Sequence, residues 1–454
     1  MARTFSVRQA LAQLTAGFLL SLLINASVRG EDLLEIYHKA QLNDPTFEAA
    51  RYELEANREK IPQALAGLLP VLSVSGSDNL NRLNTVFSTT PTVPRDIRSW
   101  NWTLQLTQPL VRAQNFYAYS ESESIVEQAI AQYAKAEQDL ILRVAQPYFD
   151  VLVAQESIPV ANAQVSAMEE QFKIAKLGFD AGTHAITDVY EAKSKIDLAR
   201  SERVAAFNAL DIKRAELEKV IGEMPKALSA LKPDLVSPTL EPNDPQIWIN
   251  QARENNPAVR VPKAALEAAE VEVKRNLAEY LPTVDAIASY GGSFSSGSVY
   301  PSDYSTISKT QQVGLQLNMP LFSGGATNSR VNEAIANKYK ANANLEVARR
   351  EAAHDARLAF TGIVNGLSQI EALSSAVESS RNAVQASQTG YKLGANANID
   401  VLNSDHQLYT AQRDLVQARY DTLLQGLKLK AAAGVLTEAD LITINAFLAK
   451  SEPP

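Results

Sequence analysis

The chain has 454 residues, no cysteine and a formal net charge of −8 at neutral pH. The lack of cysteine excludes disulfides, thiolate metal sites and lipid attachment through an N-terminal cysteine. The acidic balance disfavours nucleic acid as a partner. No nucleophile, phosphate-loop or paired-carboxylate motif is visible, so we expect neither an enzyme nor a cofactor. No metal site is expected either, because no metal-ligand spacing joins the four histidines, His38, His184, His354 and His406.

Residues 1–30 have the pattern of a secretory signal peptide. Arg3 and Arg8 precede an apolar core at 16–24 (AGFLLSLLI). This core is much shorter than the ~20 residues of a membrane span, so an exported protein is favoured over an anchored one. Cleavage after Ala26 and cleavage after Gly30 both fit the sequence, and we favour the second.

The mature chain contains a long internal duplication. The segment at 40–70 reappears at 252–282, so that Pro45 corresponds to Pro257 with a shift of 212 residues. Repeats of about half a chain are much longer than the units of a solenoid. We therefore expect two structural repeats, at 31–240 and 241–450, each with a helix, a strand pair, a long helix and a further helix, and a short tail at 451–454.

Helices with coiled-coil seams dominate both halves. A first helix is expected over 32–69, and a helix over 112–178 would span roughly 100 Å. Spacings of three and four residues place one apolar stripe along the long helix and a matching stripe in the second half. The first stripe comprises Val151, Ala154, Ile158, Ala161, Val165, Met168, Phe172, Ala175 and Phe179, and the second comprises Ile363, Ile370, Val377, Val384 and Tyr391.

Between these helices the sequence predicts two strands per half. Trp100, Trp102, Leu104 and Leu106 alternate with polar residues, as do Val313, Leu315 and Leu317 in the second half. Two hairpins on a soluble core would fit this alternation. An outer-membrane barrel with a polar lumen explains it better, although four strands per chain would need several chains to close.

The turn after each seam carries a glycine and then an acid. Gly182 and Gly394 are most simply turn glycines. The spacing from Asp188 to Glu191 also fits a capping box, with the acid at the start of the returning helix.

The mature chain, from about residue 32 to 447, resembles the TolC family of outer-membrane channel-tunnels. The segments that carry this resemblance are LQLTQPL at 104–110, GTHAITDV at 182–189, YKLGANANIDVL at 391–402 and LKLKAAAGVLTEADL at 427–441. The resemblance implies a mixed α+β membrane protein that forms a homotrimer. Four strands per chain would close a twelve-stranded outer-membrane β-barrel, continued by a long periplasmic α-helical coiled-coil barrel, with the linker near 223–246 in a belt.

The resemblance also implies which residues have roles. Asp188, Asp400, Thr187 and Tyr391 would form and gate the periplasmic entrance, where Asn396 and Asn403 replace an arginine and an acid found in the family. Tips that contact a periplasmic adaptor would include Gly182, Thr183, His184, Gly394 and Ala395. Trp100, Trp102 and Tyr300 could be aromatics of the membrane belt, although ordinary barrel packing fits them equally well.

The function that the resemblance implies is an exit duct in the outer membrane of a Gram-negative bacterium, extending into the periplasm. Its partners would be a periplasmic adaptor protein, an inner-membrane pump of the ABC or RND type and outer-membrane lipid. The exported cargo would be proteins, by type I secretion, or small toxic compounds. The alternative is a periplasmic coiled-coil scaffold without a channel.

Overall fold

The computed structural model describes residues 30–84, 94–232, 241–296 and 305–448. These residues form two compact units, each made of segments from both halves of the chain. The strand unit comprises residues 50–134 and 257–350, and the helical unit comprises the remainder.

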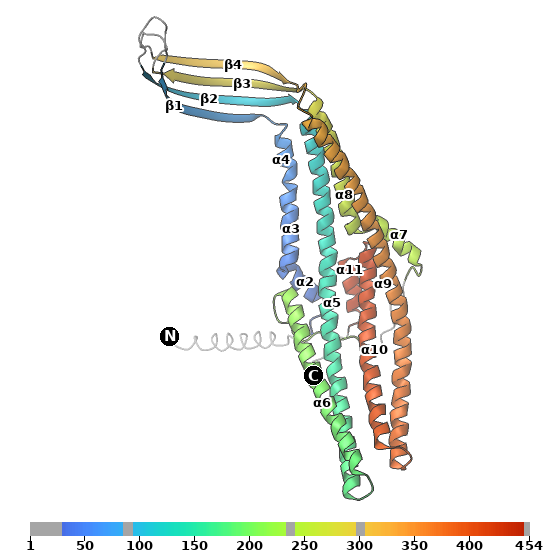
Figure 1. Ribbon diagram of the computed structural model, residues 1–454. Helices are drawn as coiled ribbons and strands as arrows, with labels where there is room; N and C mark the ends of the chain where they lie inside the picture. Colours follow the sequence, from blue (N-terminus) through green and yellow to red (C-terminus); the bar gives the residue numbers. More distant parts are fainter. Residues whose placement is uncertain (1–29, 85–93, 233–240, 297–304, 449–454) are drawn as a thin grey trace, which may run out of the picture. The chain divides into compact units, whose positions relative to one another are not determined.

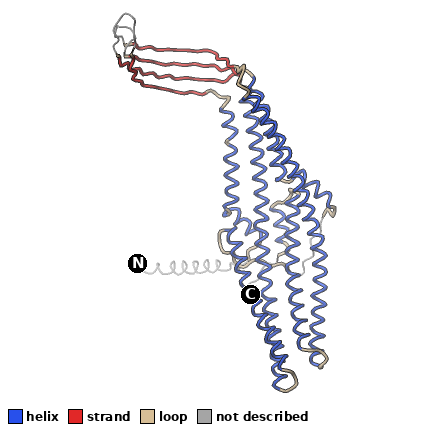
Figure 2. The backbone as a smooth tube through the Cα atoms, viewed as in Figure 1, coloured by secondary structure: helices blue, strands red, loops and turns tan. Residues whose placement is uncertain are grey.

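The strand unit contains one antiparallel sheet of four long strands (Figures 1 and 2). The strands are β1 (Val71–Leu83), β2 (Arg95–Val111), β3 (Thr283–Ser295) and β4 (Thr306–Asn318). Their spatial order is β1-β2-β3-β4, so the two strands of each sequence half are neighbours and β2 joins the halves. The predicted strand pair in each half is confirmed, and β1 and β4 are the two edges of the sheet.

The register of the sheet separates apolar from polar side chains. Leu104 pairs with Val74 on β1 and with Tyr290 on β3, while Thr103 pairs with Ser75 and Gly291. Alternation along each strand extends this difference over the part of the sheet between Leu72 and Trp102, whereas toward the end of β1 the apolar face gives way to the ion pairs Arg98–Asp78 and Arg82–Asp96. One face carries Leu72, Val74, Trp100, Trp102, Leu104, Leu106, Val313, Leu315 and Leu317, and the other carries Ser73, Ser75, Asn101, Thr103, Gln105, Ser289, Ser293, Gln312 and Gln316.

Ion pairs connect two strand ends and two helices within the strand unit. At the end of β2, Arg112 binds Asp285 of β3 with an N–O distance of 2.6 Å. Arg275 of α8 (Pro257–Leu277) binds Glu121 of α5 (Ala113–Asp180) at 2.8 Å. The Arg112–Asp285 pair is bidentate and partly shielded from water, so it fixes the relative position of its two side chains more than an exposed single pair does.

The predicted first helix is three helices, so this boundary was wrong. They are α2 (Leu33–Asn43), α3 (Pro45–Arg58) and α4 (Lys60–Ala66). The first break has a local cause: Asp44 precedes a proline and adopts an extended conformation with ψ of 112°. The second half repeats this break, where Asn256 separates α7 (Pro245–Asn255) from α8 before Pro257.

In the helical unit, two long helices turn back into shorter ones. Residues 135–180 of α5 are followed by α6 (Ile186–Ile221), and residues 351–392 of α9 (Ala326–Lys392) by α10 (Asn398–Ala432) and α11 (Glu438–Asn445). Most positions of the predicted seams lie in the core: Val151, Val165, Met168 and Ala175 are buried on α5, as are Ile363, Val377, Val384 and Tyr391 on α9. Phe179, predicted as the last seam position on α5, is instead 42 % exposed. Each hairpin therefore closes on its own apolar stripe.

Among the described residues, no helix is both long enough and apolar enough to cross a membrane.

Candidate functional site at the hairpin ends

The two hairpin ends of the helical unit have the same backbone. In the first, the amides of Thr183 and His184 both donate to the Gly178 carbonyl. In the second, the amides of Ala395 and Asn396 donate to the Gly390 carbonyl. Gly182 and Gly394 both have φ of 75°, in the left-handed region that favours glycine. The duplication thus reproduces the turn at both ends, and both turn glycines are explained.

A second glycine in each hairpin makes room for a turn side chain. A methyl group at Gly178 would lie 1.6 Å from His184 Cδ2, and one at Gly390 would lie 2.7 Å from Asn396 Nδ2. Gly178 and Gly390 are still helical, since α5 and α9 end two residues later. These glycines therefore provide space for the His184 and Asn396 side chains.

The acids lie inside the returning helices. α6 begins at Ile186 with Ala185 as its N-cap, so Asp188 is the third helical residue and the predicted capping box is wrong. Asp400 occupies the same position in α10, where its Oδ2 accepts a hydrogen bond from the Ala397 amide at 3.1 Å. A carboxylate in the first turn is favoured by the helix dipole.

The first hairpin contacts the second through His184. Its ring stacks on Tyr391 with a centroid distance of 5.3 Å and an interplanar angle of 16°. Its Nε2 lies 3.5 Å from the Tyr391 hydroxyl, and its Nδ1 lies 3.9 Å from Asp188 Oδ2. Burial and, second, the negative charge of Asp188 raise the pKa of the Tyr391 phenol, so this phenol stays protonated at neutral pH.

Other contacts between α6 and α10 are hydrogen bonds and apolar packing instead of ion pairs. Asn398, which is 1 % exposed, donates to the Asp188 carbonyl at 3.4 Å. Lys195 donates to Asn403 Oδ1 at 3.1 Å. Leu402 is fully buried among residues of α5 and α6. Of the predicted entrance residues, the structure brings Asp188 and Tyr391 to one junction, places Asn403 on a second contact, and leaves Thr187, Asn396 and Asp400 exposed.

The structure also reveals residues that spacing did not single out. Asp405 is 2 % exposed, and its Oδ2 has no hydrogen-bond partner among the described residues. Burial raises its pKa to about 6. Lys195 and Asn398 were also missed, because their partners lie more than two hundred residues away in the sequence.

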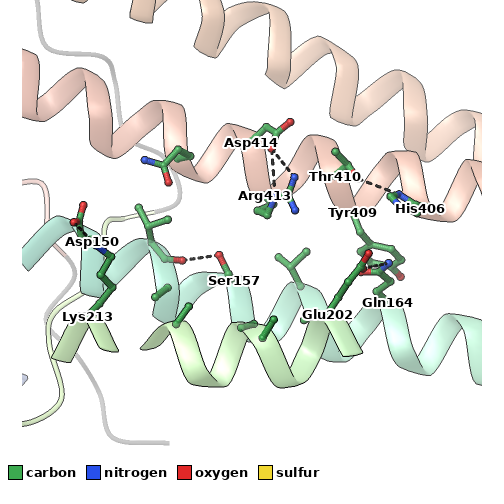
Figure 3. Close-up of a pocket in the computed structure, with 18 residues that line it drawn as sticks. Asp150, Ser157, Gln164, Glu202, Lys213, His406, Tyr409, Thr410, Arg413 and Asp414 are labelled. Atoms are coloured by element: carbon green, nitrogen blue, oxygen red, sulfur yellow. Dashed lines mark hydrogen bonds and ion pairs between the residues drawn. The ribbon is translucent and has the colours of Figure 1, made fainter. Parts of the chain in front are cut away.

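A groove of about 610 Å³ lies between α5, α6 and α10 (Figure 3). Its charged groups have partners: Lys213 binds Asp150 at 3.1 Å, and Gln164 donates to Glu202 at 2.9 Å. Short side chains leave room for another backbone to approach; they are Ala154, Ala161, Ala205, Ala206 and Ala209.

In the strand unit, the aromatics predicted for the membrane belt pack on neighbouring strand residues. Trp100 stacks on Phe294 at 6.0 Å, and Trp102 meets Tyr290 edge-on at 5.4 Å. Both tryptophans remain partly exposed. Tyr300 lies outside the described residues.

Within the described part of the chain, no group of three or more His, Asp or Glu side chains could hold a metal ion.

The chain is similar in sequence and in fold to known outer membrane proteins. The profile of the family described as Outer membrane efflux protein matches residues 36–223 and 248–435. The alkaline protease secretion protein AprF of Pseudomonas aeruginosa is 32 % identical over 99 % of this chain and 93 % of its own length. The outer membrane protein TolC of Vibrio cholerae is 28 % identical over 94 % of this chain and 95 % of its own length. Among solved structures, the outer membrane protein VceC of Vibrio cholerae matches 88 % of this chain and 96 % of its own, with a TM-score of 0.75 at 17 % identity.

Proposed function

We propose that this chain, which belongs to the outer membrane efflux protein family, is an exit duct in the outer membrane. The observation that carries this proposal is the match of the whole chain to proteins of secretion and efflux, combined with a four-stranded sheet that has one apolar and one polar face. Family membership also confirms the predicted resemblance and the predicted location in the outer membrane. The predicted fold class is confirmed as well, with strands joined to long coiled-coil helices.

The duct would be built from three copies. The sheet ends in two edges, β1 and β4, whose outward backbone groups have no strand partner within the described residues. Pairing β4 of one copy with β1 of the next would remove these edges and close the sheet. The face with Leu104 and Leu315 would then contact lipid, and the face with Thr103 and Gln312 would line a water-filled lumen.

The hairpin ends would form the periplasmic entrance. In three copies, Asp188 and Asp400 would contribute six carboxylates around one mouth. A ring of carboxylates favours cations over anions. Tyr391 would hold the mouth closed through its contact with the first hairpin.

A periplasmic adaptor would bind at the turns and in the groove between α5, α6 and α10. A partner helix fits this groove because its alanines permit close approach and its charged rim offers both signs, from Lys213 and Arg413 to Asp150 and Glu202. An inner-membrane pump would complete the export system. Because the name of the relative AprF refers to protease secretion, proteins are the cargo that we propose first, with small toxic compounds as the second candidate. We propose no catalytic role.

Conductance of the purified mature protein in planar lipid bilayers tests the duct. We expect long-lived, cation-selective channels from protein that requires detergent for extraction. The scaffold alternative would instead give protein that stays in the aqueous fraction and adds no conductance.

A further inference from the structure

His184 occupies an unusual position for a residue at a loop tip. Its side chain is 28 % exposed and lies between α5, α6 and α9. α5 provides the space at Gly178, α6 provides Asp188, and α9 provides the ring of Tyr391. Of the described residues, Asp188 and Tyr391 are the titratable groups that face the imidazole. His184 therefore links the two hairpins of one chain.

We propose that His184 is a proton-sensitive latch, which holds the two hairpin ends of each chain together more tightly when its imidazole is protonated. The proposal rests on the duct proposed above, because the latch acts on the entrance of that duct.

Both neighbours of the ring can interact favourably with an imidazolium. Asp188 Oδ2, 3.9 Å from Nδ1, would form an ion pair with it. The face of Tyr391 attracts a cation through its ring electrons. The Tyr391 hydroxyl, 3.5 Å from Nε2, can accept from an imidazolium N–H or donate to a neutral nitrogen, so it opposes neither form. The contact between the hairpins is therefore stronger when the imidazole is protonated and weaker when it is neutral. An imidazole is the side chain whose ordinary titration falls between pH 5 and 8.

The duplication makes this latch asymmetric. In the other repeat, Asn396 stands in place of His184, and Phe179 stands in place of Tyr391. Phe179 is 42 % exposed, and neither it nor Asn396 titrates. A trimer would thus carry an imidazole contact within each chain, whereas the repeat-related contact between copies would have no imidazole. Asn396 packs against Gly390 as His184 packs against Gly178, so an asparagine side chain fits in this type of turn.

Channel recordings on the purified trimer at a series of pH values test the latch. For the wild type we expect the mean conductance to fall by about three- to tenfold between pH 8 and pH 5.5, since a weak ion pair is gained in each of three copies. His184→Asn should lose most of this pH dependence. The variant keeps Asp188 and Asp400, so any pH dependence from the carboxylates themselves would remain in it. His354→Gln, at an exposed histidine on α9 away from the turns, should behave as the wild type does.

The outcomes separate the latch from the duct. Conductance that does not change with pH in the wild type, or that changes equally in His184→Asn, would overturn the latch and leave the duct standing. If no variant conducts at any pH, the duct fails and the latch fails with it. Should His184→Asn not assemble, His184→Gln replaces it in the same comparison with the wild type.

Discussion

At the scale of single residues, the most consequential finding is a buried acid, Asp405. Its carboxylate lies near the hairpin junction on α10, two residues beyond Asn403, and one of its oxygens has no partner among the described residues. Removing a carboxylate from water without a partner disfavours its charged form. The raised pKa of about 6 follows from this burial.

The expected effect of Asp405 on stability has a definite sign. Its folded-state pKa is above the ordinary value for aspartate, so its charge costs stability at neutral pH and costs nothing below the unfolded pKa. The free energy of unfolding should therefore fall as the pH rises from about 4 to 6. Asp405→Asn keeps the size but cannot ionise, and should raise the stability at pH 7 by about 1–3 kcal/mol. Denaturant unfolding at pH 4 and pH 7 measures this.

A matched control exists in Asp414, a partly exposed acid of the same helix that pairs with Arg413 at 3.2 Å. Asp414→Asn should change stability little at either pH. Equal stabilisation of both variants at pH 7, or no difference between the two pH values for the wild type, would contradict a specific cost at Asp405.

Sequence reasoning reached some of these residues and missed others for a physical reason. Gly182, Gly394 and the seam positions follow from local rules on backbone freedom and helix periodicity. The contact of His184 with Tyr391 joins residues 207 apart, and nothing in the local sequence of either hairpin indicates their distance. The wrong capping box at Asp188 had a similar cause, because the motif GTHAITDV fixes a helix start only to within a few residues.

At the scale of elements, each turn depends on a backbone that only glycine adopts easily. No neighbouring atom lies within 4 Å of a methyl group built on Gly182, so strain from a substitution there comes from the backbone alone. Gly182→Ala should cost about 1–2 kcal/mol. Faster hydrogen exchange of the amides at 181–186 should report this loosening.

Gly426→Ala serves as the comparison for that experiment. Gly426 is inside α10, and a methyl group there also has no neighbour within 4 Å, but its backbone is helical. Alanine is the better helix former, so stability should rise by about 0.5–1 kcal/mol. Destabilisation of the same size in both variants would mean that the left-handed turn is not the cause.

Element boundaries were less predictable than the elements themselves. Both long helices and both strand pairs are present, because four heptads of seam and a run of strict alternation are strong periodic signals. Pro45 signals the break at Asp44, but the apolar seam continues past it and predicts one unbroken helix. The pairing of β2 with β3 was not predictable, because it joins two halves whose hairpins are each complete by local rules.

At the scale of the whole molecule, the proposed duct requires several chains to associate. One chain leaves a sheet with two open edges and an apolar face that includes Val313 and Leu315, which are 87 % and 72 % exposed. Such a surface is unfavourable in water and invites pairing. Three copies around one lumen would cover both edges and place the apolar face in lipid.

Disulfide cross-linking between strand edges tests that arrangement most directly. Because the sequence has no cysteine, only the introduced cysteines can form disulfides. Within one sheet, β1 and β4 are separated by two strands, about 14 Å, which is beyond the reach of a disulfide. Cysteines would be placed pairwise on the polar face, at Ser73, Ser75 or Ser77 of β1 together with Thr310, Gln312 or Gly314 of β4. After oxidation in the outer membrane, we expect at least one pair to yield a covalent trimer, whereas chains with a single cysteine remain monomeric on denaturing gels. Monomers alone from every pair would contradict the closed assembly of three chains.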